Sequence, residues 1–153
     1  MRSVEPWVAR PLSTFVTESA ARVTLLMTPS GQVIAQHGFA GALDVMSAAA
    51  LGAAIQSSSQ ELAVLMRWPP FRTMVHQGAS QGHFLCRFLT PRGWWIGLVV
   101  FGTDTSLGLV QLFFERMVKE LVSVTPQEDR PAEVLPADFE ADLHASLRAL
   151  FGR

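Results

Sequence analysis

The chain has 153 residues and one cysteine, and 12 Lys and Arg residues nearly balance 13 Asp and Glu residues. This length suits a single domain with a substantial core, so no disulfide or structural metal is needed for folding. No basic run is dense enough to follow a phosphate backbone, which argues against nucleic acid as a partner. The apolar runs are too short to cross a bilayer and the N-terminus lacks a secretory signal, so we expect a cytoplasmic protein without membrane insertion.

The first 40 residues predict a short helix followed by a β-hairpin. Pro11 is tolerated near the start of a helix, and the apolar residues after it have helical spacing. Residues 22–27 and 32–37 are rich in β-forming side chains and flank the turn sequence Thr-Pro-Ser-Gly at residues 28–31. We therefore expect two antiparallel strands here.

A long alanine-rich helix is predicted next. Asp44 is a candidate N-cap, and the helix should end near Met66 because Pro69 and Pro70 cannot continue it. Alanine and glycine nearly surround the helix over residues 48–54, so a second backbone or a flat partner surface could approach closely. Packing against its own sheet would account for only one face, which favours self-association or partner contact.

Three further strands are predicted over residues 71–77, 83–89 and 94–101. Alternate residues of the second strand share one apolar face: Phe84, Cys86 and Phe88. Residues 94–101 are apolar on both faces, which is typical of a central strand covered on both sides. Cys86 lies within this apolar pattern, so we expect a buried small hydrophobe rather than a reactive thiol.

The end of the chain predicts two helices separated by a linker. Polar residues at 103–106 can cap a helix that continues to about Leu121 with one apolar stripe. Residues 125–136 are polar and interrupted by proline, so we expect a flexible linker between a domain at 1–124 and a helix at 137–153. The apolar stripe of that last helix needs a surface to cover, and it comprises Phe139, Leu143, Leu147 and Leu150.

The motifs that carry chemistry are missing from this sequence. No strand is followed by GxxxxGK[ST] or GxGxxG, so the chain is not itself expected to bind a nucleotide. The four histidines are too far apart in sequence to form a local metal motif, and Ser57-Ser58-Ser59 lacks the glycines of a nucleophile elbow. We therefore expect no catalytic residue, no cofactor and no metal, with the histidines as ordinary surface or strand residues.

The order of these elements is α, β, β, α, β, β, β, α. Five mostly antiparallel strands with helices on both faces form an α+β sandwich, followed by a helical tail. Two segments carry a family resemblance: TSLGLV at residues 105–110, and residues 44–78. Both resemble the bacterial MglB-type branch of the Roadblock (dynein light-chain) family, over about residues 20–122. The resemblance implies a Roadblock/profilin-like α/β/α sandwich.

The same resemblance implies a two-fold dimer built from the long helix and the strand after it. The matching interface residues are Ala49, Ala53, Phe71, Thr73 and Val75. In MglB-type proteins such a dimer presents a helical platform to the Ras-like GTPase MglA. The matching partner-binding residues are Ala54, Ser57, Ser58 and Glu61.

This chain departs from the MglB-type pattern on that platform. Residues 52–55 read Gly-Ala-Ala-Ile where MglB-type proteins tend to have Thr-Ala-Gly-Asn, and Gln60-Glu61 replaces a Gly-Gly pair. A lost amide and an added charge could each weaken a desolvated contact by about 1–3 kcal/mol. The leading hypothesis is therefore a non-catalytic dimeric adaptor, similar to MglC adaptors, in an MglA-type module that controls cell polarity and motility. Its expected partner is an MglB-type protein or an associated regulator, in the cytoplasm or at the cell poles.

Two alternative functions stay open. The chain could be a GTPase-activating protein for an MglA-type GTPase, as the long ungapped resemblance indicates. It could also be a small-molecule-sensing sandwich domain. Against that second alternative, we expect the large side chains of the sheet to fill the interior, namely Phe84, Phe88, Trp94 and Trp95. A well-formed pocket beside them would favour it.

Overall fold

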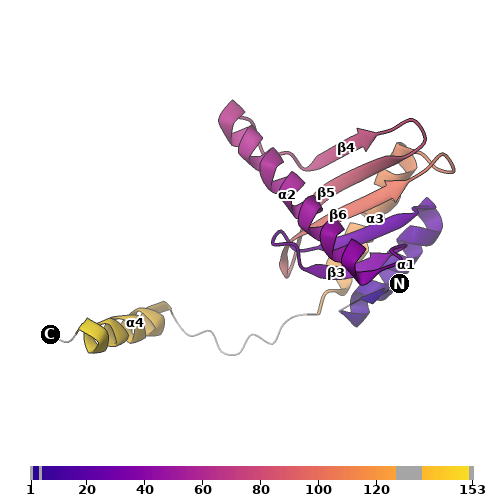
Figure 1. The fold of residues 1–153 in the computed structure, drawn as a ribbon. Helices are drawn as coiled ribbons and strands as arrows, with labels where there is room; N and C mark the ends of the chain where they lie inside the picture. Colours follow the sequence, from indigo (N-terminus) through magenta and orange to yellow (C-terminus); the bar gives the residue numbers. More distant parts are fainter. Residues whose placement is uncertain (1, 4, 127–135, 152–153) are drawn as a thin grey trace.

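The computed structural model describes residues 2–3, 5–126 and 136–151. Its centre is one antiparallel sheet with the strand order β1-β3-β2-β6-β5-β4 (Figure 1). The strands are β1 (Arg2–Ser3), β2 (Val23–Met27), β3 (Val33–His37), β4 (Thr73–Gln77), β5 (Gly82–Thr90) and β6 (Gly93–Phe101). The five predicted strands and the α+β class are confirmed. β1 was not predicted, because a two-residue strand that pairs with β3 leaves no alternating pattern in the sequence.

The helices are α1 (Pro6–Ser19), α2 (Ala42–Met66), α3 (Leu107–Val124) and α4 (Pro136–Phe151). α1 and α3 cover one face of the sheet and α2 crosses the other, which gives the expected three layers (Figure 1). Ser106 caps α3 as predicted, since its hydroxyl oxygen accepts a hydrogen bond from the Leu109 amide at 3.3 Å. Among the described helices, none is both long and apolar enough to cross a membrane.

Two helix starts differ from the prediction. α1 begins at Pro6, and Pro11 lies inside the helix rather than near its start. A proline there removes a backbone hydrogen bond, and burial of neighbours such as Leu12 and Phe15 offsets that loss. The N-cap of α2 is Gly41, not Asp44, because the helix begins earlier at Ala42. Asp44 lies in the first turn, where the helix dipole favours a carboxylate.

The larger core lies between the sheet and the α1–α3 layer. Its centre is Phe114 of α3, whose ring makes edge contacts with three others at centroid distances of 5.8, 5.1 and 5.6 Å. Those partners are Phe15, Phe84 and Phe88. Gly97 of β6 makes room for this ring, because a Cβ atom there would lie 2.5 Å from it. The glycine in the central strand therefore allows the helix to pack closely.

A smaller core lies under the first half of α2. Ala49 has no exposed surface and packs with Leu25, Leu85 and Ile96 against the sheet. Gly52 also faces the sheet, where a Cβ atom would lie 2.9 Å from the methyl group of Met27. Small residues on this stripe thus bring α2 close to its own sheet. Packing against the sheet therefore accounts for the small residues on one face of the alanine-rich segment.

The large side chains of β5 and β6 divide between the two faces. Phe84, Phe88 and Trp95 are buried in the larger core, as expected, and so is Cys86. Trp94 is 46% exposed, so the prediction that it fills the interior is wrong. Side chains alternate across a strand, and burial of Trp95 therefore directs Trp94 to the α2 face, beside the end of the smaller core.

Candidate functional site

The second half of α2 carries an unusual amount of exposed apolar surface. This end of the helix extends past the strands of the sheet (Figure 1). Leu62 is 50% exposed and Leu65 is 81% exposed. Other exposed apolar residues of α2 and the turn after it are Met46, Leu51, Ile55, Val64, Met66 and Trp68. Four of these residues share one side of the helix, namely Leu51, Ile55, Leu62 and Met66. An exposed apolar surface of this kind marks an interaction site on a folded domain.

This exposed helix lies beside β4, the last strand in the sheet order. A shallow hollow between them is lined by Leu51, Ala54, Ile55, Ser58, Ser59, Leu62, Met74 and His76. We call five of these residues the α2–β4 surface: Leu51, Ile55, Leu62, Met74 and His76. An edge strand has one row of backbone N–H and C=O groups available for pairing with another chain. The α2–β4 surface therefore combines apolar side chains with an open hydrogen-bonding edge.

The residues predicted for the dimer interface do not all lie on this surface. Ala49 is enclosed in the smaller core, so its side chain has no surface to offer a second copy in this conformation. Ala53 is half-buried on the other flank of α2. Val75 packs toward the larger core, and Thr73 shares that side of β4 because its hydroxyl donates to the Cys86 sulfur at 3.6 Å. Phe71 is half-buried just before β4.

Leu51, Ile55 and Leu62, which lie on the α2–β4 surface, were not singled out from the sequence. Their spacing of four and seven residues was the available signal, since such positions share one side of a helix. The predicted partner-binding residues are all at least partly exposed on α2: Ala54, Ser57, Ser58 and Glu61. Ala54, Ser58 and Glu61 lie on its outer side, where Ala54 and Ser58 also border the hollow beside β4. Ser57 lies on the flank toward β6.

The structure describes the side chains of only two of the four residues in the predicted apolar stripe of the last helix, the residues expected to dock the tail. Leu147 and Leu150 are exposed on α4, and neither core cluster includes a described residue of that helix. The side chains of Phe139 and Leu143 lie outside the described part of the chain, as do residues 127–135 of the expected linker.

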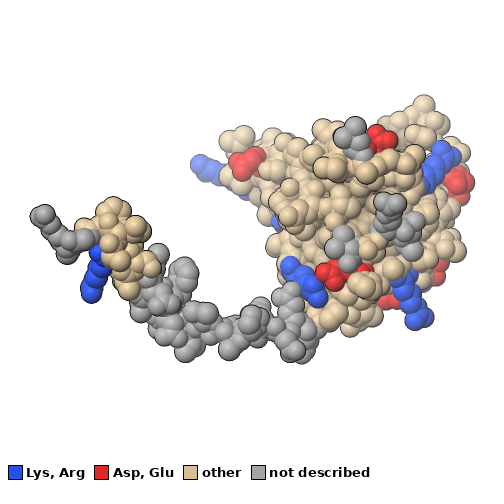
Figure 2. Space-filling model, turned by 60° about the horizontal axis from the view of Figure 1, so that its bottom comes forward, with Lys and Arg blue, Asp and Glu red and all other residues tan. Residues whose placement is uncertain are grey.

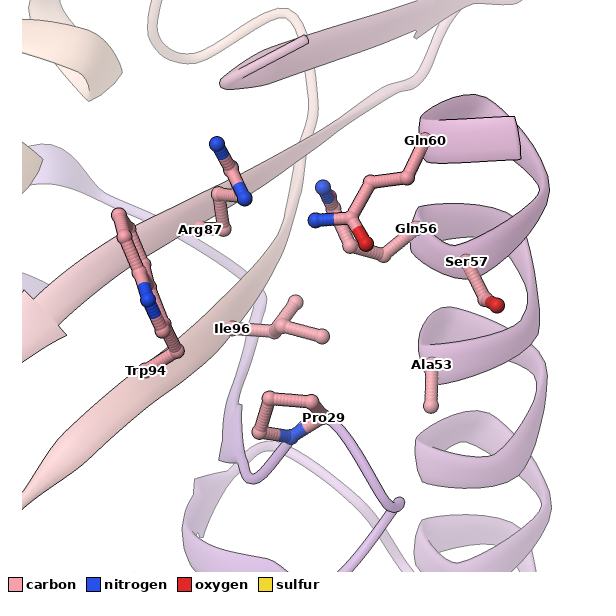
Figure 3. Close-up of a pocket in the computed structure, with 8 residues that line it drawn as sticks. All are labelled: Pro29, Ala53, Gln56, Ser57, Gln60, Arg87, Trp94 and Ile96. Atoms are coloured by element: carbon pink, nitrogen blue, oxygen red, sulfur yellow. The ribbon is translucent and has the colours of Figure 1, made fainter. Parts of the chain in front are cut away.

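A cleft of about 350 Å³ separates α2 from the sheet on the flank opposite β4 (Figure 3). Gln56 and Gln60 of α2 point toward Arg87 of β5 and Trp94 of β6. The remaining lining residues are Pro29, Ala53, Ser57 and Ile96. No sequence motif indicated this cleft, because its residues come from four separate segments. The one local signal was a charged residue, Arg87, within an otherwise apolar strand.

Two residues that line this cleft each have a buried polar atom without a hydrogen-bond partner. Gln56 is only 4% exposed; its Nε2 donates to the Phe71 carbonyl oxygen at 3.4 Å, but its Oε1 has no partner. The Nε of Arg87 is likewise buried and without a partner. The guanidinium carbon of Arg87 lies 4.6 Å from the centroid of the Trp94 ring, so a cation–π contact orients it.

His76 and His83 form a cross-strand pair at the α2–β4 surface. They are direct partners in the β4–β5 register, and their ring centroids are 4.6 Å apart. Burial lowers the pKa of His83 below its ordinary value, and the nearby His76 lowers that pKa further. Among the described residues, no group of three or more His, Cys, Asp or Glu side chains is placed to hold a metal ion.

Acidification is therefore expected to destabilise the fold through His83. The unfolded imidazole keeps a pKa near 6.5, above the folded value, so the unfolded state binds the proton more tightly. The stability present above the unfolded pKa is lost as the pH falls below it, until the folded pKa is passed. Urea unfolding between pH 8 and 5 measures this loss. The fall should be smaller in His83→Gln and unchanged in His144→Gln; equal falls in all three proteins would contradict it.

Charged side chains are sparse on the face of the sandwich drawn in Figure 2. Lysine and arginine side chains lie apart from one another there, and acidic side chains lie between them. Most of this face is uncharged. An electrostatic funnel for a polyanion needs a contiguous basic patch, which this face does not present.

Comparison with known proteins identifies the scaffold. No protein-family model matches the sequence, and no curated protein matches it. Among solved structures, Myxococcus xanthus MglB aligns with 25% identity and a TM-score of 0.69, over 79% of this chain and 96% of that one. The gliding protein MglB from Thermus thermophilus aligns with 25% identity and a TM-score of 0.66, over 76% of this chain and 87% of that one.

A third structure shares the fold at lower identity. The Roadblock/LC7 domain from Streptomyces avermitilis has 18% identity and a TM-score of 0.61, over 70% of this chain and 88% of that one. The strand order and the helical layers described above agree with these likenesses. The chain therefore has the Roadblock fold, and its 25% identity to two MglB structures is consistent with the MglB-type branch of that family.

Proposed function

We propose that this chain is a dimeric, non-catalytic Roadblock adaptor in an MglA-type GTPase module that controls cell polarity and motility. The α2–β4 surface is the observation that carries this proposal. Leu51 and Leu62 would be unusually exposed for a monomer, at 65% and 50%, and they lie beside the edge strand β4. A second copy would cover the apolar side chains and pair the open edge at the same time.

The proposed dimer is isologous, with β4 of one copy antiparallel to β4 of the other. Each copy then contributes the same apolar residues, so every favourable contact occurs twice. The outer sides of the two α2 helices would form one platform. Ala54 and Ser58 are small enough to leave this platform flat, and Glu61 adds one charge from each copy. We propose that an MglB-type protein or an associated regulator binds there, in the cytoplasm or at the cell poles.

Activation of GTP hydrolysis is the second candidate function, supported by the 25% identity to two MglB structures. The adaptor function is favoured because Glu61 replaces a glycine of the MglB-type pattern on the exposed outer side of α2. GTP hydrolysis by purified MglA should be measured with and without this chain. An unchanged rate, together with a dimer in sedimentation, is expected; clear stimulation would establish the activating function instead.

We also propose that residues 1–124 fold independently of the linker at 125–136 and the helix at 137–153. Both core clusters are built from residues before Val124, without a described residue of α4. A chain truncated after Val124 should therefore keep its free energy of unfolding within about 0.5 kcal/mol of the full chain. Urea unfolding at equal dimer concentration measures this difference. A loss of several kcal/mol would show that the tail belongs to the domain.

A further inference from the structure

The cleft between α2 and the sheet combines a hydrogen-bonding end with an apolar end. Arg87, Gln56 and Gln60 form the polar end, while Ile96, Pro29 and Ala53 form the apolar part (Figure 3). Its volume of about 350 Å³ is near the lower end of the range of roughly 300–1,000 Å³ found for small-molecule sites. The cleft therefore has the size and polarity of a ligand pocket.

The polar groups of the cleft indicate the chemistry of a ligand more closely than the shape of the cleft does. Arginine can only donate hydrogen bonds, and its planar fork matches a carboxylate. Within the described part of the chain, no acidic side chain forms an ion pair with Arg87. The amide oxygen of Gln56 can only accept, and it is buried without a partner. A buried polar group without a partner is unfavourable by about 1–3 kcal/mol, so a ligand that supplies the missing partner would gain that free energy.

We propose that this cleft binds a small organic carboxylate that has a planar apolar body and a second group with an O–H or N–H donor. The carboxylate pairs with the guanidinium of Arg87, which Trp94 already orients. The donor binds the free oxygen of Gln56, and the planar body lies against Ile96 and Pro29. A neutral apolar ligand would leave both polar groups unpaired, so the site should select against it.

This inference is independent of the proposed dimer, because the cleft and the α2–β4 surface lie on opposite flanks of α2. It supplies a candidate binding site for the alternative function of small-molecule sensing. Ser57 lies at the rim of the cleft and is adjacent in sequence to Ser58, which lies on the outer side of α2. A bound ligand would thus lie next to the proposed platform without contacting β4.

Binding of three related probes tests the proposal: 4-hydroxybenzoate, benzoate and 4-hydroxybenzamide. Titration of the full chain is followed by NMR of the Arg87 Nε–H and the side-chain amides of Gln56 and Gln60. We expect saturable shifts with 4-hydroxybenzoate and an affinity at least about tenfold weaker for the neutral 4-hydroxybenzamide, since a charge-assisted hydrogen bond is lost. Benzoate, which lacks the donor, should bind with intermediate affinity.

Two variants and a matched control complete the test. Arg87→Met should weaken 4-hydroxybenzoate at least about tenfold, and Gln56→Leu should abolish the preference for 4-hydroxybenzoate over benzoate. Arg10→Met, which removes an exposed arginine from α1, should change neither affinity. Equal affinities for the acid and the amide, or shifts that never saturate, would overturn the proposal. It would also be overturned if no probe binds while Arg87→Met reduces retention of an MglB-type protein, because the cleft would then belong to a protein interface.

Discussion

Replacing Phe114 with alanine is expected to lower the free energy of unfolding by about 3–5 kcal/mol. The ring is 1% exposed and makes edge contacts with Phe15, Phe84 and Phe88, so it connects both helices of one layer with two positions on β5. Removal of the ring leaves a cavity directly above Gly97, which has no side chain to fill it. The loss therefore includes both the buried area and the empty volume.

Phe113→Ala provides the matched control for this prediction. Phe113 is the preceding residue of the same helix, but it is only half-buried and Arg116 lies over its ring at 5.5 Å. Its removal should reduce the free energy of unfolding by less than half as much. Urea unfolding at one protein concentration compares the two variants. Similar losses in both would show that Phe114 is not the centre of the core.

Leu62→Asp is expected to weaken self-association at least about 100-fold. Leu62 is half-exposed in one copy and lies on the α2–β4 surface, so dimer formation would desolvate it. An unpaired carboxylate buried in an interface is unfavourable by about 3 kcal/mol or more, and about 1.4 kcal/mol corresponds to a tenfold change in affinity. The two-fold axis introduces this charge twice. Sedimentation equilibrium measures the dissociation constant directly.

Val64→Asp is the matched control, since Val64 is 69% exposed on the same helix and only two residues away. Positions two apart on a helix do not share a side, so this carboxylate should remain in water. The dimer should persist in Val64→Asp and dissociate in Leu62→Asp, with the fold of both variants intact by circular dichroism. An unchanged dissociation constant in Leu62→Asp would place the interface elsewhere. A wild-type chain that sediments as a monomer at high concentration would refute the dimer itself.

Most of the fold could be predicted from local patterns. The doubly apolar run that became β6 and the amphipathic stripe of α3 both have one strong period, and the turns between strands contain proline or glycine. The two errors at helix starts had different causes. Pro11 is tolerated inside α1 because its neighbours are buried, and the start of α2 moved from Asp44 to Ala42 because glycine can serve as the cap.

The candidate sites were less predictable because they depend on the rotation of α2 about its axis. The sequence showed small residues around most of this helix, but only the structure shows that Ala49 and Gly52 are the ones against the sheet. That rotation directs Leu51 and Leu62 toward β4 and Gln56 toward the cleft. The cleft also requires Arg87 and Trp94 to lie near a helix that ended at Met66, more than twenty residues earlier in the chain. Such long-range proximity has no periodic signature in the sequence.

The position of β6 has a consequence for where this domain can tolerate change. Hydrogen bonds occupy both edges of β6, through β2 and β5, and its side chains enter both cores. The α1–α3 layer and the α2 layer therefore cannot separate from the sheet independently of β6. Most of the sandwich should unfold as one cooperative unit. β4 lies at the periphery of that unit and pairs only with β5 among the described strands. Substitutions on β4 should therefore be tolerated while the interior stays the same.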